Sequence, residues 1–383
     1  MLIAFESHPI QYRAPLFREI ERLCPGKLEV VYFSDSSIRG YRDAGFGVEV
    51  RWNVPLLEGY RDLMVGSQGD AHSAGLRGLT GKGVFKYLRR RRPTAVLFSQ
   101  FAHRFELSAY LTCIVLGIPI WIRQETQDEA YHRGWAKQLL RRLLYRIAYL
   151  KVTRAFYIGE LNREHLLRHG IKRSRLVRAP YAAVDHYAGW GRADKLRSRE
   201  QLREKLGIGS SAVVIGFFGK LIPKKQPDLL LEAWAHLPAN LRERVHLLVI
   251  GAGSLEAEMR ARAQAEGIRS TFAGFVNQAE IGQYYLAADI VVLPSRKMGE
   301  TWGLVVNEAL SAGCGVVITN AVGCHREFGG WERVRVIPVG NAAACARAIT
   351  ELSGFSRDFD WSRTLMENYS MEESAAAIGR LVT

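Results

Sequence analysis

Short, almost wholly apolar runs recur along the second half of the chain, and each is followed by a segment long enough for a helix. The runs cover Ala212–Gly219, Val245–Gly251, Thr271–Phe275, Asp289–Ser295 and Gly315–Thr319. Helical segments between them cover Pro227–His236, Leu255–Ala265, Ala279–Ala287 and Gly303–Ala312. Strands that are apolar on both faces belong to sheets covered on both sides. The pattern therefore predicts an α/β domain with a parallel sheet and helices on both faces.

The first half repeats this pattern less regularly. Its predicted strands are Leu2–Phe5, Leu28–Ser34, Thr94–Ser99, Ile118–Arg123 and Ala155–Gly159. Residues 40–82 are Gly-rich and are expected to be irregular, and residues 180–192 interrupt the alternation. A chain of 383 residues exceeds one ordinary core, so we predict two domains, 1–185 and 186–365, with a cleft between them.

Composition places the chain among ordinary globular proteins, with 48% hydrophobic and 24% charged residues. The five cysteines are scattered and show no CxxC spacing, so neither a disulfide framework nor a zinc site is expected. The chain begins without a basic region ahead of an apolar run, and residues 107–122 are too short to span a bilayer. We therefore expect a cytoplasmic protein, if anything peripheral on the inner face of a membrane.

Positive charge is concentrated in the first half. Residues 1–190 hold 30 Lys and Arg against 17 Asp and Glu, so this half carries most of the net charge of +15. Nucleic acid, an anionic membrane surface and a phosphate-bearing acceptor are all partners that this charge would favour.

The segment SRKMGETWGLVVNEAL, residues 295–310, is the most informative motif. A predicted strand ends at Ser295, a loop carries Glu300, and a helix begins near Gly303. Gly303 has no Cβ, so a ligand can approach the backbone there. The N–H groups of Leu304 and Val305 would point out of the helix start, where the dipole favours an anion.

A second carboxylate, Glu308, follows Glu300 by eight positions. Helical rise places the two on the order of 10 Å apart. That distance is too long for a shared proton, but it suits two contacts on one extended ligand. Carboxylates accept hydrogen bonds from hydroxyls, so sugar rings are natural partners.

The segment GFFGKLIPKK supplies cations after the first predicted strand of the second half. Gly219 permits close approach, and Lys220 and Lys225 can reach a diphosphate. Two fixed cations beside a leaving phosphate can take the role that Mg²⁺ has elsewhere.

Together these motifs resemble the family 4 retaining glycosyltransferases of the GT-B fold, which has two Rossmann-like domains facing a central cleft. The resemblance rests on ETWGLVVNEAL, on GKLIPKK in place of the family's G-R-x-x-x-x-K loop, and on GFVNQAEIGQYYLAADIVVLPS. The opening SHPIQYRAPLF resembles a polysaccharide-building subgroup. The resemblance also implies that residues 366–383 form a helix packed back on the first domain.

The resemblance implies a role for each matching residue. Glu300 would hold donor-sugar hydroxyls, Lys220 and Lys225 the diphosphate, and Glu308 the ribose. The remaining donor-side residues are Gly219, Gly274, Phe275, Ser295, Thr301, Trp302, Gly303, Leu304 and Val305, with Gly274 and Phe275 along the base. It also implies a nucleotide-diphosphate sugar as donor, a carbohydrate or lipid-linked acceptor, no cofactor or metal, and retention of anomeric configuration by front-face attack.

The acceptor side departs from the family. Many members carry a histidine after the strand that corresponds to Ile118–Arg123, but this chain reads RQETQ, with Glu125 near that place. The candidates for the acceptor or the donor sugar are therefore His8, Gln11, His103, Arg123 and Glu125. Arg123 and Glu125 can alternatively pair with each other, and either histidine can be structural.

Other motifs have two interpretations. GAGSLE, residues 251–256, mimics a dinucleotide fingerprint but lacks the third Gly, so a tight strand-to-helix turn is favoured. DFD, residues 358–360, mimics a metal-binding motif but is not assigned to a metal. The segment Lys137–Lys151 places Leu140, Leu143, Leu144 and Ile147 on one face of a helix. That helix either packs on the first sheet with its basic face exposed to solvent, which we favour, or binds to a membrane surface.

Two other functions remain open from sequence alone. A nucleotide-sugar epimerase or a phosphorylase can use the same fold and phosphate site. A nucleic-acid-binding protein would explain the basic first half, but the chain lacks an aromatic-basic recognition motif, so we expect no nucleic acid partner.

Overall fold

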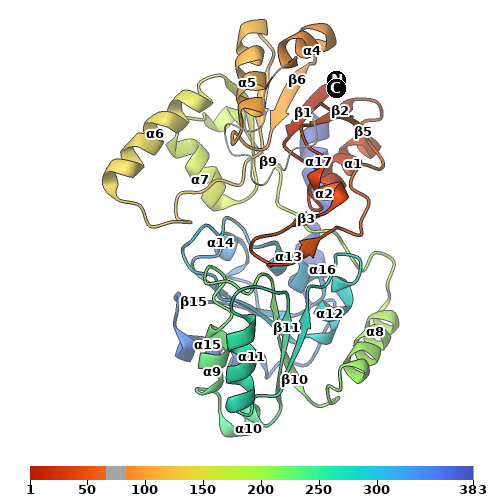
Figure 1. Ribbon diagram of the computed structural model, residues 1–383, viewed down its shortest axis with the longest axis vertical. Helices are drawn as coiled ribbons and strands as arrows, with labels where there is room; N and C mark the ends of the chain where they lie inside the picture. The colour runs from red at the N-terminus through yellow and green to blue at the C-terminus, as the bar shows by residue number, and fades with distance from the viewer. Residues whose placement is uncertain (66–80, 82, 383) are drawn as a thin grey trace.

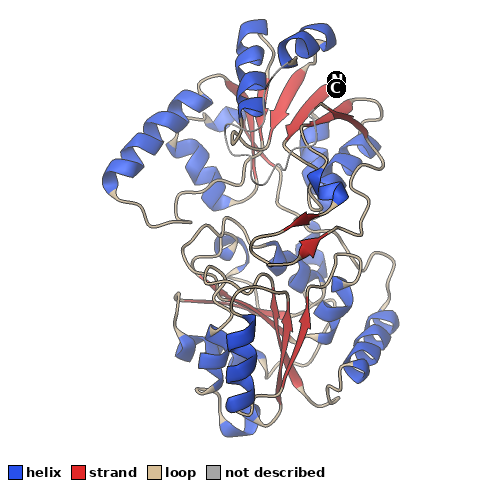
Figure 2. Cartoon of the chain, viewed as in Figure 1, coloured by secondary structure: helices blue, strands red, loops and turns tan. Residues whose placement is uncertain are grey.

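The computed structural model describes residues 1–65, 81 and 83–382, and these form two α/β units, each built on a parallel sheet (Figures 1 and 2). The first sheet has the order β5-β2-β1-β6-β7-β8-β9. Its strands are β1 Leu2–Glu6, β2 Leu28–Tyr32, β5 Arg61–Met64, β6 Ala95–Phe98, β7 Ile120–Ile122, β8 Val152–Tyr157 and β9 Leu176–Arg178.

The second sheet has the order β12-β11-β10-β13-β14-β15. Its strands are β10 Val213–Phe218, β11 Val245–Ile250, β12 Ser270–Gly274, β13 Ile290–Leu293, β14 Gly315–Thr319 and β15 Val334–Ile337. A separate antiparallel pair, β3 Tyr41–Arg42 and β4 Glu49–Val50, extends from the first unit toward the second (Figure 1). We call residues 41–50 the hairpin.

Helices cover both faces of each sheet (Figure 2). In the first unit they are α1 Ala14–Leu23, α2 Ser36–Arg39, α4 Val84–Arg91, α5 Arg104–Leu116, α6 Trp135–Tyr149 and α7 Glu160–Arg168, with the 3₁₀ turn η1 Arg173–Arg175. The others are α8 Arg192–Lys205, α9 Leu229–Trp234, α10 Ala239–Arg242, α11 Glu256–Ala265, α12 Ile281–Ala287, α13 Leu304–Ser311, α14 His325–Phe328, α15 Ala342–Leu352, α16 Arg363–Glu367 and α17 Met371–Gly379.

Alternation along the strands explains why both faces are covered. In β1, Ile3 and Phe5 join one core cluster, whereas Leu2 and Ala4 join the cluster on the opposite face. In β10 the same split separates Val213, Ile215 and Phe217 from Val214 and Phe218. Because successive side chains point to opposite faces, an all-apolar strand needs a layer of helices on each side.

The predicted α/β class is confirmed, and all five predicted strands of the second half are present. The edge strands β5, β9 and β15 were not predicted, because RDLM, LVR and VRVI carry charges that a half-exposed edge tolerates. The segment expected to be irregular contains the hairpin and β5, and its residues 66–80 and 82 lie outside the described residues.

The C-terminal helix α17 returns to the first unit. It packs against α1, and Ala375 and Ile378 are fully buried in the same cluster as Phe17 and Leu16. Figure 1 shows this blue helix beside the red strands of the N-terminus, so the chain crosses between the two units twice.

Helix α6 corrects a prediction. We expected its apolar face to pack on the first sheet, but Leu140, Leu143, Leu144 and Ile147 each have more than half of their surface exposed. The buried residue of α6 is Tyr149. The pattern alone identified the two faces of the helix and could not tell which of them is turned toward the core.

Candidate functional site

The predicted donor-side residues lie at the carboxyl edge of the second sheet. Gly219 and Lys220 follow β10, and Ser295 follows its neighbour β13. Gly274 is the last residue of β12, which is separated from β10 by β11. In open parallel sheets, ligands bind at this edge. The sheet therefore gathers residues that are up to 76 positions apart in the sequence.

Loops at the carboxyl edges of the two sheets are bonded to each other. The N–H of Gly299, after β13, donates to the carbonyl of Ala130, after β7, at 2.8 Å, and Tyr131 forms a bridge with Met298. The amide of Asn307 in α13 donates to the carbonyl of Tyr181 at 2.9 Å. The predicted cleft is thus crossed by specific contacts between the units.

The lysine loop after β10 is fixed by the loop after β11. The N–H of Leu221 donates to the carbonyl of Ala252, and that of Leu255 to the carbonyl of Leu221, both at 2.9 Å. A Cβ on Gly251 would lie 1.9 Å from the carbonyl oxygen of Gly219, and both glycine-demanding positions, Gly251 and Gly253, have positive φ. GAGSLE is therefore a tight turn that positions the lysine loop.

Lys225 and Glu300 form an ion pair at the centre of the donor side. The hydroxyl of Ser295 also donates to Glu300, at 3.1 Å, and Lys224 donates to the carbonyl of Gly299 at 2.9 Å. Burial alone would raise the pKa of Glu300, but Lys225 and Lys224 outweigh it and hold the pKa below its ordinary value. Glu300 is therefore a buried, ionised acceptor of hydrogen bonds.

Lys220 contacts a residue of the hairpin. Its ammonium donates to both carboxylate oxygens of Asp43, at 2.7 and 2.8 Å, and lies 4.9 Å from the centre of the Phe46 ring. Burial by itself would raise the pKa of Asp43. The hydrogen bonds from Lys220 and from the N–H groups of Phe46 and Gly45 outweigh that effect, so the pKa lies below its ordinary value. A carboxylate of the first unit thus lies where a diphosphate oxygen is predicted.

The start of α13 is shaped by packing. Gly303 has φ of +105°, and a Cβ there would lie 2.8 Å from the Val322 side chain and 3.0 Å from that of Leu293. The fold itself thus requires a glycine at this position, in addition to the ligand approach that we inferred. The indole N–H of Trp302 donates to Asn307 at 2.8 Å and its carbonyl accepts from the N–H of Cys324 at 3.1 Å, so Trp302 anchors the loop before α13.

Thr301, Leu304 and Val305 are half-buried around this helix start. The first N–H groups of a helix have no intrahelical partner, so those of Leu304 and Val305 are donors for a ligand. Thr301 lies tightly against Gly323, where an added Cβ would come 1.8 Å from its carbonyl oxygen. The loop before α13 is thereby held against the turn that follows β14.

Glu308 is nearly enclosed. The hydroxyl of Tyr285 donates to it at 2.6 Å, and the Tyr285 ring stacks on Phe218 with centres 3.9 Å apart. Burial raises the pKa of Glu308 to about 7, with hydrogen bonds from Tyr285 and Gln278 opposing the rise. Glu308 can therefore exchange between an ionised acceptor and a protonated donor near neutral pH.

Phe275 meets aromatic residues of the first unit. Its ring centre lies 5.1 Å from that of Phe46 and 6.0 Å from that of Trp52. The neighbouring Asn277 donates to the carbonyl of Arg51 at 2.7 Å. Gly274 has φ of +73° with open space around it, so the predicted base side of the site is open at the backbone and aromatic at the side chains.

On the first unit, Glu125 is held by a buried network. Tyr181 donates to it at 2.5 Å and Arg13 at 3.2 Å, and Arg13 also donates to Glu6 at 2.6 Å. Glu125 follows β7 and Glu6 ends β1, two strands separated in the sheet by β6. Its side chain keeps about a quarter of its surface exposed, so one oriented carboxylate remains accessible.

Arg123 has different partners. Its guanidinium donates to the carbonyl of Pro180 at 3.1 Å and to the hydroxyl of Ser374 in α17 at 3.3 Å, and it lies over the Tyr181 ring. The contacts of Arg123 and Glu125 are therefore made with other residues rather than with each other. Arg123 links the carboxyl end of β7 to the C-terminal helix.

The two candidate histidines follow β1 and β6. The Nδ1 of His8 lies 2.9 Å from the hydroxyl of Ser7. His103 lies at the start of α5, 3.1 Å from Glu106, and the backbone N–H of His103 donates to the same carboxylate. These contacts give His103 a structural role in capping α5, and Gln11 is half-buried in the turn before α1.

Several residues of this region were not predicted, including Asp43, Arg13, Glu6 and Tyr285. Asp43 lies in the segment that we expected to be irregular, and Tyr285 lies within an apolar helix. A sequence signal existed only for Glu6, which is a charged residue at the end of an apolar strand. Burial of such a residue requires a charged partner.

Among the described residues, one group has ligand atoms close enough for a cation, namely Asp128, His165 and His169. The Asp128 carboxylate is already engaged by Arg168 at 2.9 Å and by His165 at 2.9 Å. An arginine on the same carboxylate disfavours a bound cation, so these residues form a structural network between α7 and the loop that follows β7.

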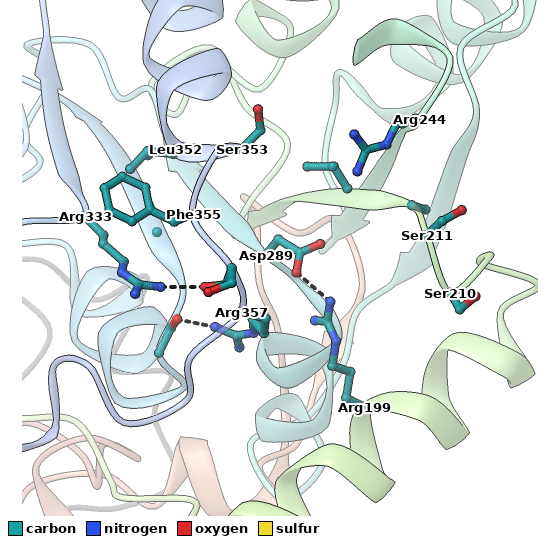
Figure 3. Close-up of a pocket in the computed structure, with 15 residues that line it drawn as sticks. Arg199, Ser210, Ser211, Arg244, Asp289, Arg333, Leu352, Ser353, Phe355 and Arg357 are labelled. Atoms are coloured by element: carbon teal, nitrogen blue, oxygen red, sulfur yellow. Dashed lines mark hydrogen bonds and ion pairs between the residues drawn. The ribbon is translucent and has the colours of Figure 1, made fainter. Parts of the chain in front are cut away.

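A cavity of about 250 Å³ lies elsewhere on the second unit (Figure 3). It opens near Val213, Asp289 and Gly315, at the amino ends of β10, β13 and β14. Its arginines are largely engaged: Arg199 donates to Asp289 at 2.5 Å, and Arg357 to the carbonyl of Ala312 at 2.8 Å. This cavity is on the edge opposite the donor-side residues.

Comparison with known protein families gives a match over part of the chain. Residues 198–354 match the family described as "Glycosyl transferases group 1". This region contains the lysine loop, Glu300 and Glu308, so the predicted donor side and the family match coincide.

Solved structures extend the likeness to the whole chain. A crystal structure of Anabaena HepE in complex with UDP superposes with a TM-score of 0.74 at 16% identity, covering 99% of both chains. WaaG, described as a glycosyltransferase involved in lipopolysaccharide biosynthesis, gives 0.62 at 17% identity, again covering 99% of both. The predicted GT-B fold, two parallel-sheet domains in series, is thereby confirmed.

Curated relatives match over a shorter stretch. The D-inositol 3-phosphate glycosyltransferase of Geodermatophilus obscurus is 35% identical over 210 residues, which cover 48% of this chain and 46% of that protein. The protein of the same name from Rhodococcus opacus is 29% identical over 236 residues, or 54% and 51% of the two chains. The chain spans about half the length of the curated relatives it matches.

Proposed function

We propose that this protein is a glycosyltransferase that moves a sugar from a nucleotide-diphosphate sugar to an acceptor hydroxyl in glycan, polysaccharide or glycolipid biosynthesis. The single observation that carries the proposal is the grouping of Lys220, Lys225, Glu300 and the α13 N-terminus at one sheet edge, inside the group 1 match.

In this site the cations would neutralise the diphosphate. A donor diphosphate would displace the Asp43 carboxylate from Lys220 and accept hydrogen bonds from the N–H groups of Leu304 and Val305. Glu300 would bind sugar hydroxyls and Glu308 the ribose, with the base beside Gly274 and Phe275. Fixed positive groups at a leaving phosphate stabilise the charge that develops there, so these residues supply the stabilisation by themselves.

We also propose retention of anomeric configuration, with the leaving phosphate taking the acceptor proton on the same face of the sugar. The support is that Glu300 is ion-paired with Lys225, whereas Glu308 lies within α13 and accepts a hydrogen bond from Tyr285, so neither is placed as an attacking nucleophile. On the acceptor side, Glu125 is the best-oriented group, because Arg13 and Tyr181 fix its carboxylate while part of it stays exposed.

The decisive experiment has two stages. Thermal shift with UDP, GDP and ADP, and with their sugars, identifies the donor, since a ligand that binds only the folded state raises Tm. Nucleoside diphosphate release is then measured with and without candidate acceptors, including inositol phosphate because relatives carry that name. Release that depends on an acceptor is expected, and release without any acceptor would contradict transfer.

An epimerase is the second candidate, because a putative UDP-N-acetylglucosamine 2-epimerase from Listeria monocytogenes superposes with a TM-score of 0.60 at 13% identity. At that identity the likeness concerns the fold. Conversion of a nucleotide sugar without any acceptor, followed by proton NMR, would favour the epimerase.

A further inference from the structure

Helix α6 exposes an apolar stripe that contacts no other part of the described chain to any large extent. Six residues form it, each with 55% to 68% of its surface exposed: Leu139, Leu140, Leu143, Leu144, Ile147 and Leu150. At 100° per residue these positions fall within an arc of about 140°. Trp135, at the start of the helix, is 81% exposed. We call these seven residues the α6 stripe.

Cations border the stripe on both sides. Arg142 and Arg146 follow one edge, Lys137 and Lys151 the other, and all four are exposed. Residues 135–151 contain no Asp or Glu. A stripe of leucines between rows of Lys and Arg is the arrangement of helices that lie in the plane of an anionic bilayer surface.

The opposite side of α6 holds the helix in place. Tyr149 is buried, its hydroxyl donates to Gln124 at 3.0 Å, and the Tyr145 ring centre lies 4.7 Å from that of His165 on α7. Figure 1 shows α6 on the outer flank of the first unit. The stripe is therefore presented outward by a helix that is anchored on its other face.

We infer that the α6 stripe docks this protein on an anionic lipid bilayer, with the leucines among the acyl chains and the flanking cations at lipid headgroups. No helix among the described residues is long and apolar enough to cross a bilayer, so the contact is a surface one. The helix extends about 22 Å, which lets the whole stripe enter the interface at once.

The charge and the apolar surface of the α6 stripe together favour an anionic bilayer over other binding partners. A second copy of the chain would bring two acid-free, basic stripes together, and like charges would repel. Nucleic acid would neutralise the cations but leave six leucines and isoleucines in water. An anionic bilayer satisfies both the apolar and the cationic residues.

Docking through α6 places the first unit at the membrane and leaves the donor side of the second unit in water. If the proposed function holds, a lipid-linked acceptor would reach Glu125 from the same side. That last step rests on the proposed function, whereas docking itself is independent of any sugar donor.

The test is co-sedimentation of the full chain with vesicles of phosphatidylcholine alone or mixed with phosphatidylglycerol, without donor or acceptor. We expect binding to the anionic vesicles, weakened by salt. Leu143→Ser/Leu144→Ser and Arg142→Glu/Arg146→Glu should each reduce the partition coefficient by about tenfold or more. Leu196→Ser and Arg192→Glu/Arg197→Glu, at exposed positions on α8, are the controls and should bind like wild type.

Tm is measured for every variant, and the exposed positions predict little change. The inference is overturned if wild type ignores anionic vesicles, or if the controls lose binding as much as the α6 variants. It is also overturned if wild type does not bind vesicles but forms a dimer in analytical ultracentrifugation, and Leu143→Ser/Leu144→Ser is a monomer. Binding of duplex DNA without binding of vesicles would overturn it as well.

Discussion

At the scale of single residues, the site is a set of charged groups whose partners come from distant parts of the chain. Glu300 is ionised beside Lys225, Asp43 is ionised beside Lys220, and Glu308 faces a tyrosine hydroxyl instead of a cation. The difference in partner explains the difference in pKa, because burial is opposed by a cation in the first two cases and only by neutral groups in the third. Each carboxylate therefore responds differently to pH.

Glu308 predicts a pH dependence of stability. Its pKa in the folded chain is about 7, above the 4.5 of an unperturbed glutamate, so its contribution to stability is complete below pH 4.5 and is lost as pH rises through 7. In wild type, the unfolding free energy should therefore fall by on the order of 3 kcal/mol as pH rises through this range, and Glu308→Gln should abolish that fall. Urea unfolding at pH 5 and pH 8 measures it, with the exposed Glu367→Gln as control. Equal pH dependence in wild type and Glu308→Gln would contradict the assignment.

Lys225 predicts a loss of transfer. Lys225→Ala removes a charged hydrogen bond worth about 1.5–3 kcal/mol, so kcat/KM for the donor should fall at least roughly tenfold. The exposed Lys205→Ala on α8 keeps the same change in net charge and should be active. Wild-type kcat/KM in Lys225→Ala would remove Lys225 from the proposed donor site.

At the scale of elements, the hairpin and the start of α13 do what neither sheet does alone. The hairpin brings Asp43 and Phe46 to Lys220 and Phe275 of the other unit. Helix α13 brings backbone N–H groups and Glu308 to the same edge. The site is therefore assembled by loops and helix ends on a rigid sheet, the usual division between scaffold and function.

Asp43 predicts competition with the donor. If its carboxylate occupies Lys220 until a diphosphate replaces it, Asp43→Asn should tighten nucleoside diphosphate binding by up to about tenfold. Isothermal titration measures this, with Asp35→Asn, which removes a surface ion pair to Arg39, as control. Weaker binding in Asp43→Asn would mean that Asp43 orients Lys220 for the phosphate.

Gly303 predicts a cost in stability at the helix start. Gly303→Ala forces a Cβ against Val322 and Leu293 at a positive φ, which should lower the unfolding free energy by about 1–3 kcal/mol. Gly330→Ala, where a Cβ would meet nothing within 4 Å, is the control. The two variants are compared by thermal unfolding, and equal Tm values would contradict the packing argument.

At the scale of the whole molecule, the C-terminal helix links the last part of the chain to the first unit. Helix α17, at the C-terminus, completes the core of the first unit, and Ser374 within it bonds Arg123 at the carboxyl end of β7. Ion pairs from Arg326 to Glu129 and Glu164, at 2.8 and 2.6 Å, add contacts between the units. These pairs are partly exposed and each is worth little, whereas α17 adds fully buried apolar side chains to the core of the first unit.

Ile378 tests that contribution of α17. Ile378 is fully buried on α17, and Ile378→Ala should cost about 2–5 kcal/mol. Leu365→Ala on α16 removes a side chain that is 42% exposed and should cost far less. Chemical unfolding of both variants measures the difference, and a small effect of Ile378→Ala would mean that α17 is a loose appendage.

The sequence by itself determined the two parallel sheets, because strands buried on both faces must be apolar throughout. It also determined which edge carries the lysine loop, Glu300 and Glu308, since residues that follow parallel strands meet at the carboxyl edge. Only the tertiary structure decided that Lys220 pairs with Asp43, that Glu125 is held by Arg13 and Tyr181, and that the leucines of α6 face outward. Those partners lie on separate elements, and spacing along a chain does not encode how distant surfaces meet.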